Sequence, residues 1–286
     1  MPGATTKEML VTELRDLSRR LSEVAGQAAQ TVGDQLRTAF RQAMEVDYKR
    51  DNHDLVTRYD RLAEDRIREA ILEQVPDSVV VGEERGAEGS GDVRWYVDPI
   101  DGTANFVSGF AFFCTSIGAV VDDRVVAGAV FDPIANNLFA ADLTGAYCNG
   151  EKIISTGTAD ESHAVLITSY PTARDLDRDG PVSLERLGEL IDTYSSLRRP
   201  GSAALTLSHV AAGWVDAAFG TTVNPWDVSA GILLVEQAGG LYRPLGADQA
   251  TPAWAAPAYV ASTGSLEPKV LDRIVTAFEQ GLPPQG

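Results

Sequence analysis

Four acidic residues of this chain, Glu83, Asp98, Asp101 and Asp227, are spaced so that they could act together. Asp98 ends the apolar run Trp95-Tyr96-Val97, which predicts the end of a buried strand. An ionised carboxylate at such a place costs several kcal/mol unless it is paired or binds a metal ion. Asp101 follows across a turn that contains a proline, so both aspartates can face one point. The spacing therefore predicts a metal site.

The types of the surrounding residues indicate which metal and which reaction. Oxygen ligands with no nearby His or Cys favour Mg²⁺ or another oxygen-loving ion over zinc. The three histidines, His53, His163 and His209, are scattered and match no zinc or nucleophile arrangement. Gly102 and Thr103 offer backbone N–H groups and a hydroxyl beside the metal, where a phosphate could bind. Together these residues favour a Mg²⁺-dependent phosphatase.

Each acidic residue also has a simpler explanation. Glu83 is followed by a second glutamate, and such pairs are common on protein surfaces. Asp98 can cap the following turn, although this leaves Asp101 unexplained. Asp227 can be the N-cap of a helix over residues 228–237, a role that is compatible with binding a metal or phosphate.

Composition narrows the class of protein and partner. The chain has 286 residues, enough for one large domain or two smaller ones, and 44% of them are hydrophobic, as in ordinary globular enzymes. The formal net charge of −17 disfavours nucleic acid or an anionic membrane as a partner. An acidic protein that handles phosphate also needs cations, which agrees with a metal site.

Features of location point to the cytoplasm. The sequence has no apolar run of about 18 residues and no apolar segment of a signal peptide, so we expect neither a membrane span nor secretion. Cys114 and Cys148 have no metal-type spacing. We expect them to be free thiols in a reducing cytoplasm, with a disulfide between them as the open alternative.

Helices and strands of the first half must position these acids. Apolar residues at spacings of four and three predict one helix, or two broken near Gly26 or Gly33, that packs on the protein's own sheet rather than in a coiled coil. These apolar residues are Leu10, Leu14, Leu17, Leu21, Val24 and Ala28. A further helix is predicted over residues 56–74, with Asp60, Glu64 and Arg68 on its polar side. Strands are predicted over residues 78–81, 95–97, 116–121, 125–131 and 138–141.

The pattern changes in the second half. Strands are predicted over residues 164–169 and 215–219, and helices over residues 184–194, 203–213 and 228–237. This alternation predicts an α/β half after an α+β half. We expect an N-terminal α+β domain over residues 1–158, which carries most of the metal ligands. A C-terminal α/β domain over residues 159–286 would close the substrate site.

Five motifs follow one another in an order that resembles the inositol monophosphatase family. The resemblance covers roughly residues 45–245. The motifs are Lys49…Asp54-Leu55-Val56-Thr57-Arg58-Tyr59-Asp60, Gly82-Glu83-Glu84, Asp98-Pro99-Ile100-Asp101-Gly102-Thr103-Ala104-Asn105-Phe106, Gly201-Ser202-Ala203-Ala204 and Trp226-Asp227-Val228-Ser229-Ala230-Gly231. Each is weak alone, but five in order are a strong signal.

The resemblance implies a fold, an activity and a set of partners. The fold would be a layered αβαβα sandwich of the inositol monophosphatase and sugar phosphatase type, with the site between the halves. The activity would be Mg²⁺-dependent hydrolysis of a small phosphorylated polyol, with two or three Mg²⁺ ions. The resemblance further implies a homodimer and inhibition by lithium.

The resemblance also implies roles at the metal centre. Asp98 would bridge two metals, with Glu83 as a further ligand. The carbonyl of Ile100 would bind the first metal, and Asp101 and Asp227 the second. These metals would activate a water for in-line attack on phosphorus without a phosphoenzyme.

Other residues would orient the water and the substrate. By resemblance, Thr103 pairs with Glu83 to orient the attacking water, and Asp60 lies near that water or a third metal. Lys49 leans over the phosphate or is simply a surface lysine. The substrate would be bound by Asp101, Gly102, Thr103, Gly201, Ser202, Ala203 and Asp227.

One position departs from the family pattern. Inositol-selective members carry a glutamate seven residues before the Trp-Asp aspartate, and here that position is Gly220. Thr221, Thr222 or Asn224 could replace its contacts. The loss affects which polyol is preferred more than whether phosphate is cleaved. We expect inositol 1-phosphate as substrate, with histidinol phosphate or another sugar phosphate as alternatives. A catalytically silent phosphate-binding or regulatory relative is the alternative of a different class.

Overall fold

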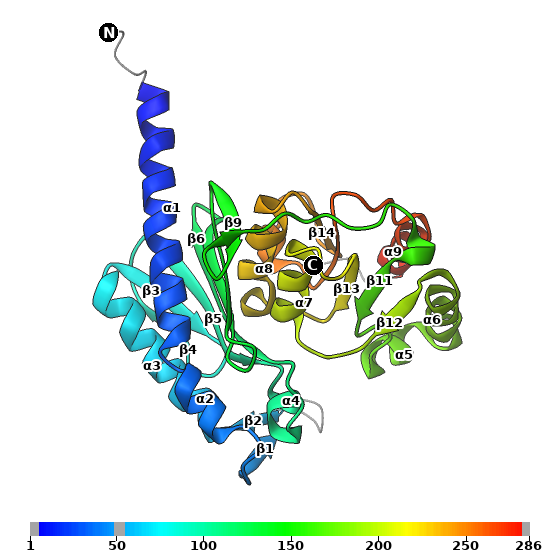
Figure 1. Ribbon diagram of the computed structural model, residues 1–286, viewed down its shortest axis with the longest axis horizontal. Helices are drawn as coiled ribbons and strands as arrows, with labels where there is room; N and C mark the ends of the chain where they lie inside the picture. Colours follow the sequence, from blue (N-terminus) through cyan, green and yellow to red (C-terminus); the bar gives the residue numbers. More distant parts are fainter. Residues whose placement is uncertain (1–5, 49–54, 282–286) are drawn as a thin grey trace.

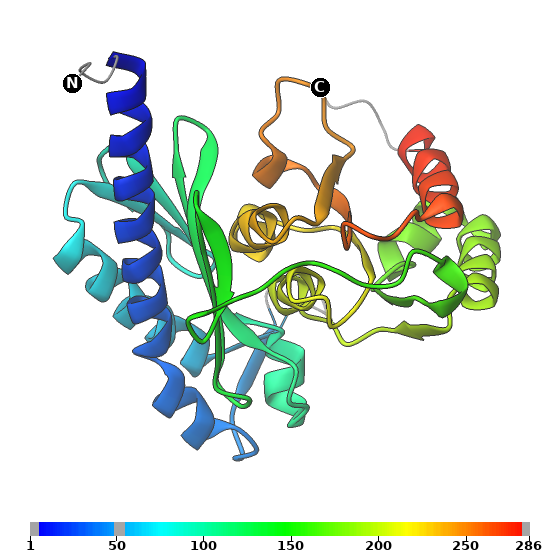
Figure 2. The ribbon, with the colours of Figure 1, turned by 45° about the horizontal axis from the view of Figure 1, so that its top comes forward.

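Two large β-sheets alternate with three layers of helices across the molecule (Figures 1 and 2). The computed structural model describes residues 6–48 and 55–281, and side chains from residue 12 onward. Reading from the N-terminal side, the layers are helix, sheet, helix, sheet and helix. This is the layered αβαβα sandwich that the resemblance implies.

The first layer is formed by helices α1 (Thr6–Gln30), α2 (Gly33–Ala39) and α3 (Arg58–Gln74). The first helix ends at Gln30 and a second begins at Gly33, so the alternative of two helices is the one observed. Leu21, Val24 and Ala28 are buried in one apolar cluster with residues of the first sheet, which confirms that this helix packs on its own protein. The side chain of Leu10 lies outside the described residues.

The first sheet has eight strands in the order β10-β9-β8-β7-β6-β5-β3-β4, and only β3 and β5 pair in parallel. Its strands are β3 (Ser78–Gly82), β4 (Gly86–Gly89), β5 (Val93–Asp101), β6 (Cys114–Val121), β7 (Arg124–Asp132), β8 (Asn137–Asp142), β9 (Gly145–Cys148) and β10 (Glu151–Lys152). Short strands β1 (Val46–Tyr48) and β2 (Leu55–Thr57) pair separately. All five predicted strands of this half are present, and β5 runs further than predicted, to Asp101.

The second sheet has five strands in the order β12-β11-β13-β15-β14. They are β11 (Val165–Thr168), β12 (Ser196–Arg198), β13 (Ala217–Thr221), β14 (Leu241–Leu245) and β15 (Ala258–Ser262). Helices α5 (Ala173–Asp179), α6 (Pro181–Thr193) and α9 (Lys269–Gln280) cover its outer side (Figure 1). Strands β12, β14 and β15 and helices α5 and α9 were not predicted from the sequence.

Helices α7 (Ala203–Ala211) and α8 (Pro225–Gln237) form the middle layer between the sheets (Figure 2). Helix α8 lies very close to the first sheet: a Cβ at Gly128 would be 2.8 Å from the Cα of Ala230. This close approach brings the start of α8 to the end of β5. Because both helices come from residues 159–286 and pack on the sheet of residues 1–158, the two halves share one core. The division into domains at residue 158 stays a prediction.

Helix α3 corrects one expectation. Asp60, Glu64 and Arg68 were predicted on a polar face, yet all three are buried. Arg68 and Glu64 pair inside the protein, where Arg68 also donates to the carbonyls of Val80 and Gly86, and Asp60 accepts hydrogen bonds from Thr57 and Thr103. The face of α3 that carries these three residues therefore faces the sheet and the site, not solvent.

Two further predictions concern membrane and thiols. Within residues 6–48 and 55–281, no helix has the length and apolar character needed to cross a membrane. Cys114 and Cys148 are both free.

Candidate active site

Three carboxylates meet between the two halves of the molecule. Oxygen atoms of Asp98, Asp101 and Asp227 all lie within 4.8 Å of one another. The first two come from the end of β5, where the pairing register with β6 shifts between them. Pro99 lies in this irregularity and has no N–H to donate, so a regular ladder is not possible there. The shift lets both aspartates serve one point.

Asp98 lies deepest in this cluster, at 2% exposure. Its Oδ1 accepts a hydrogen bond of 3.0 Å from the N–H of Ile100, within the same turn. Burial raises the pKa of Asp98 well above its usual value, and repulsion from neighbouring carboxylates raises it further. Those neighbours are Glu83, Asp101, Asp227 and Asp60.

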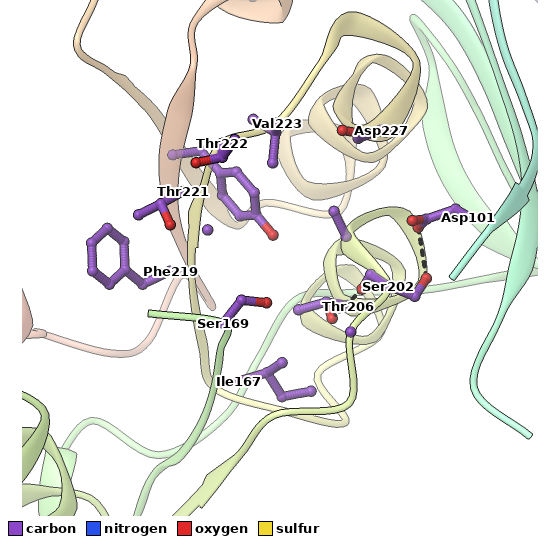
Figure 3. A pocket seen from close by; sticks show the side chains of 14 residues that line it. Asp101, Ile167, Ser169, Ser202, Thr206, Phe219, Thr221, Thr222, Val223 and Asp227 are labelled. Carbon is purple, nitrogen blue, oxygen red and sulfur yellow. Dashed lines mark hydrogen bonds between the residues drawn. The ribbon is translucent and has the colours of Figure 1, made fainter. Parts of the chain in front are cut away.

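Asp101 is held by groups from the other half of the chain. Its Oδ2 accepts a hydrogen bond of 2.6 Å from the Ser202 hydroxyl (Figure 3). The same oxygen accepts a second bond of 2.6 Å from the N–H of Ala204, at the start of α7. The thiol of Cys114 lies 3.8 Å from the same oxygen. Burial raises the pKa of Asp101 to about 6, although these hydrogen bonds oppose the increase. Asp101 thus joins the end of β5 to the middle helical layer.

Asp227 lies in the first turn of α8, so the simpler explanation that it is the N-cap is wrong. Asn224 is the cap, because Pro225 is pre-organised for the first helical position and starts the helix three residues earlier than predicted. The Oδ2 of Asp227 accepts from the backbone N–H of Asn224 at 2.7 Å. Burial and then repulsion from Asp101 raise the pKa of Asp227 well above its usual value. The carboxylate is therefore fixed by its own helix start.

Glu83 follows β3 and is close enough to the cluster for its charge to act there. It lies outside the group of three carboxylates whose oxygens are within 4.8 Å. Its charge nevertheless contributes to the raised pKa values of Asp98, Asp101 and Asp227. The structure thus places Glu83 near the three carboxylates with which it was predicted to bind metal.

The loop that carries Glu83 is fixed by Glu64, a residue that the sequence analysis placed only on a polar face. The fully buried carboxylate of Glu64 accepts from the N–H groups of Glu84 at 2.7 Å and Arg85 at 3.0 Å. A Cβ at Gly82 would lie 2.0 Å from its Oε1, so only glycine fits there. The four-residue spacing from Asp60 was the available signal, because it places both acids on one face of α3.

Asp60 and Thr103 form a hydrogen-bonded pair beside the carboxylates. The Thr103 hydroxyl lies 3.0 Å from Oδ1 of Asp60 and also 3.0 Å from the carbonyl of Ile100. The other oxygen of Asp60 accepts from the N–H and hydroxyl of Thr57, both at 2.7 Å. Burial raises the pKa of Asp60, and these hydrogen bonds partly oppose it. Lys49 and Asp54 lie outside the described residues.

A cavity of about 190 Å³ opens beside Asp101 and Asp227 (Figure 3). Five of the seven predicted substrate residues line it, and Gly102 and Thr103 do not. Those five are Asp101, Gly201, Ser202, Ala203 and Asp227. Of the three suggested replacements for the missing glutamate, Thr221 and Thr222 line the cavity and Asn224 does not.

The polar groups of this cavity are almost all neutral hydroxyls. None of the described residues that line it is a lysine, arginine or histidine, and Asp101 and Asp227 are its only acids. Its hydroxyls belong to Ser169, Ser202, Thr206, Thr221, Thr222 and Tyr259. The cavity can therefore bind an uncharged hydroxylated group, with the acidic cluster at one end.

The donor set of the acidic cluster fits a hard cation such as Mg²⁺. Within the described residues, no lysine or arginine forms an ion pair with Asp98, Asp101 or Asp227. Each hydrogen bond assigned to them comes from a neutral N–H, O–H or S–H group. Buried carboxylates that repel one another are costly without a compensating positive charge. Oxygen ligands alone favour Mg²⁺ over softer metals.

The chain is similar in sequence to proteins of a known family. The pattern described as "Inositol monophosphatase family" matches residues 17–281. A relative from Aquifex aeolicus (strain VF5), named "Fructose-1,6-bisphosphatase/inositol-1-monophosphatase", is 36% identical over 231 residues, covering 80% of this chain and 87% of the relative. "Nus factor SuhB" from Escherichia coli (strain K12) is 35% identical over 223 residues, covering 76% and 82%.

The fold is similar to that of solved structures over nearly the whole chain. The inositol monophosphatase (IMPase) of Thermotoga maritima has a TM-score of 0.78 at 30% identity, and the match covers 92% of this chain and 98% of that one. The suppressor protein suhB of Bartonella henselae has a TM-score of 0.79 at 29% identity, with the same coverage. Both sheets and the middle helices therefore have counterparts in these proteins.

Proposed function

The chain belongs to the inositol monophosphatase family, and on this basis we propose that it is a Mg²⁺-dependent phosphomonoesterase that hydrolyses a small polyol phosphate. Its first expected substrate is inositol 1-phosphate, cleaved to inositol and phosphate. One observation carries this proposal: carboxylates from both halves, two of them buried, converge at one end of a cavity lined by neutral hydroxyls. The homodimer and the cytoplasmic location stay predictions.

The metal ions would be held by Asp98, Asp101 and Asp227, together with Glu83 and the carbonyl of Ile100. We expect two or three Mg²⁺ ions, because a single divalent cation leaves more than one of these carboxylates uncompensated. Bound Mg²⁺ supplies an activated water and neutralises charge on the phosphate.

Thr103 and Asp60 would orient the attacking water. The Thr103 hydroxyl can donate its proton to Asp60 or to the Ile100 carbonyl, each 3.0 Å away. Its oxygen is then free to accept a hydrogen bond from water, and Glu83 would accept the second. A water held by two acceptors has a lone pair directed at phosphorus, which favours in-line attack.

The phosphate would be bound by the chain just after the metal ligands. The N–H groups that would bind it belong to Gly102, the N-cap of helix α4 (Thr103–Ser108), and to Thr103, the first residue of that helix. Gly102 has a φ of 99°, a left-handed conformation that favours glycine. We propose that this turn directs both N–H groups at phosphate oxygens, where they stabilise charge as the P–O bond breaks.

The cavity lining favours a neutral polyol over the alternatives. A sugar bisphosphate would bring a second phosphate, and the lining offers no cationic side chain to it. Histidinol phosphate would bring an amine, and the only acids in the lining are the two proposed metal ligands. Hydroxyl groups of a cyclitol or sugar, in contrast, match the serine, threonine and tyrosine hydroxyls.

The direct test is Mg²⁺-dependent phosphate release from four esters: inositol 1-phosphate, histidinol phosphate, fructose 1,6-bisphosphate and a nucleotide 3′,5′-bisphosphate. We expect inositol 1-phosphate to be cleaved fastest, and Asp98→Asn to abolish release from all four. A faster reaction with another ester would change the proposed substrate. If calorimetry showed that Mg²⁺ binds but no phosphate was released from any ester, the result would favour a catalytically silent relative. Such a role is consistent with the name Nus factor, which some relatives carry.

A further inference from the structure

Gly220 and Tyr259 face each other across the second sheet. They are direct partners in the antiparallel pairing of β13 with β15, so their side chains would point to the same face. A Cβ at Gly220 would lie 2.3 Å from Cε1 and 2.8 Å from Cζ of the Tyr259 ring. The ring of Tyr259 therefore fills the space that a side chain at position 220 would occupy.

Tyr259 is held rigidly with its hydroxyl at the cavity. The residue is 2% exposed and lines the cavity beside the acidic cluster. Its ring stacks on that of Tyr242, with centroids 5.4 Å apart and an interplanar angle of 16°. Burial, and then the charges of Asp101 and Asp227, raise the pKa of the phenol, so the hydroxyl stays protonated and neutral.

The Tyr259 hydroxyl has no hydrogen-bond partner within the described part of the chain. Three other cavity hydroxyls already donate inside the protein: Ser202 to Asp101, Thr206 to the Ser202 carbonyl, and Thr221 to Asp175. The hydroxyl is accessible from the cavity and can therefore form a hydrogen bond to a ligand or a water there. Ser169 and Thr222 also have no side-chain hydrogen bond within the described residues, but Tyr259 is the residue whose ring fills the space of a side chain at position 220.

We propose that the Tyr259 hydroxyl contacts a hydroxyl group of the substrate's alcohol, taking over the role of the glutamate that is absent at Gly220. This inference rests on the proposed function and specifies its substrate class. A carboxylate only accepts hydrogen bonds and carries a charge, whereas a phenol both donates and accepts and is neutral. The site therefore selects monophosphates of uncharged cyclitols or sugars and gives no advantage to a cationic group.

The test compares two esters in two matched variants. Inositol 1-phosphate offers hydroxyls to Tyr259, and p-nitrophenyl phosphate has a leaving group with none. For Tyr259→Phe we expect the ratio of kcat/KM for inositol 1-phosphate to that for p-nitrophenyl phosphate to fall about threefold to tenfold, mainly through KM. Tyr242→Phe is the control, because it removes the other hydroxyl of the same ring stack, one that is buried and lines no part of the cavity.

A second variant tests the link between the two positions. Gly220→Ala places a methyl group against the Tyr259 ring, so we expect it to displace the hydroxyl and to lower the same ratio. The double variant with Tyr259→Phe should then lower the ratio no further than one change alone, because both act on one contact. Additive effects would overturn the inference, as would an unchanged ratio in Tyr259→Phe or an equal loss with both esters.

Binding separates this inference from the proposed function. Calorimetry with Mg²⁺ and the two products, inositol and phosphate, which are not turned over, should give weaker binding for Tyr259→Phe than for the unmodified chain. If the unmodified chain binds but hydrolyses neither ester, the proposed function is wrong while weaker binding still supports the Tyr259 contact. If it hydrolyses the ester and both proteins bind equally, only the Tyr259 contact is wrong. If the unmodified chain neither hydrolyses inositol 1-phosphate nor binds its products, both are wrong.

Discussion

The two walls of the site differ in charge and in the way they are held. The wall built from the end of β5 and the start of α8 carries buried carboxylates, and each accepts hydrogen bonds from nearby N–H or hydroxyl groups. The wall built from β11, β13 and β15 carries neutral hydroxyls and apolar side chains. The comparison suggests that charge serves the reaction, while neutral hydrogen bonding selects the substrate. Changes to the first wall should abolish turnover, and changes to the second should redirect it.

Asp98→Asn should give the largest effect, because it changes the acid at the centre of the charged wall. We expect kcat to fall about a thousandfold or more with every ester, since the proposed bridging ligand is lost. In EDTA the variant should be at least as stable as the unmodified chain, because it removes one of several repelling buried charges. Steady-state kinetics and thermal unfolding in EDTA measure both. If the variant retained a tenth of the activity, the conclusion that the charged wall serves the reaction would be wrong.

Glu64→Gln tests whether Glu64 stabilises the charged wall by holding the loop that carries Glu83. The change leaves the buried Arg68 with only the exposed Glu88, 3.6 Å away, as a charged partner, and it weakens the bonds to the Glu83 loop. We expect a loss of about 3–5 kcal/mol in unfolding free energy and a fall in kcat of about tenfold to a hundredfold. Urea unfolding and kinetics give the two values. Glu69→Gln, exposed on the same helix, is the control and should change neither.

Ser202→Ala tests the contact that joins the charged wall to the start of α7. Its hydroxyl donates to Asp101 at 2.6 Å, so its loss should weaken Mg²⁺ binding by about tenfold. Calorimetric titration with Mg²⁺ measures this effect. Ser208→Ala on the same helix removes a hydroxyl that bonds only to the Ala204 carbonyl, and it should leave the affinity unchanged. Equal affinities for both variants would contradict the role of Ser202.

A change at His209 should have the smallest effect, and only on stability. It tests how one buried imidazole changes stability with pH, apart from the carboxylates of the charged wall. The ring packs among Phe112, Phe139 and Trp214, and burial lowers its pKa to about 4. The unfolded chain then binds more protons than the folded one between pH 6.5 and 4, so stability falls as pH falls through this range. We expect this residue to contribute about 1 kcal/mol of the loss between pH 6.5 and 5.5.

The check is urea unfolding of the unmodified chain and of His209→Phe at both pH values. The variant should lose less stability on acidification, because it removes the group that gains a proton on unfolding. The acidic cluster changes stability in the opposite direction, but it is common to both proteins and cancels in the difference. A larger loss in the variant would contradict the assignment.

The grouping of Asp98 and Asp101 could be predicted from the sequence because few arrangements accommodate two acids at a buried strand end. The periods of the strand and helix patterns predicted only an α+β half followed by an α/β half, and the order of the layers was implied by the resemblance to a known family. Glu64 and Arg68 were placed on a polar face because a Glu–Arg pair four residues apart is typical of exposed helices. Their burial depends on the sheet against which α3 packs.

Tyr259 shows why the neutral wall was harder to predict. The segment Ala258–Ser262 is short and apolar, and a tyrosine in such a strand is usually part of the core. Its contact with Gly220 joins residues 39 positions apart through strand pairing, which local patterns do not encode. The start of α8 was predictable in principle, because Asn224-Pro225 followed by Asp227 is a capping pattern.

The contact between Tyr259 and Gly220 limits how this site could change during evolution. A glycine codon can become a glutamate codon by a single-nucleotide change, yet a Cβ at position 220 would lie 2.3 Å from the Tyr259 ring. Loss of the tyrosine first would leave a hole beside Tyr242, which destabilises a packed sheet. Each single step therefore passes through a less fit protein. A carboxylate at position 220 therefore requires a change at position 259 as well, so the two residues are expected to change together or not at all.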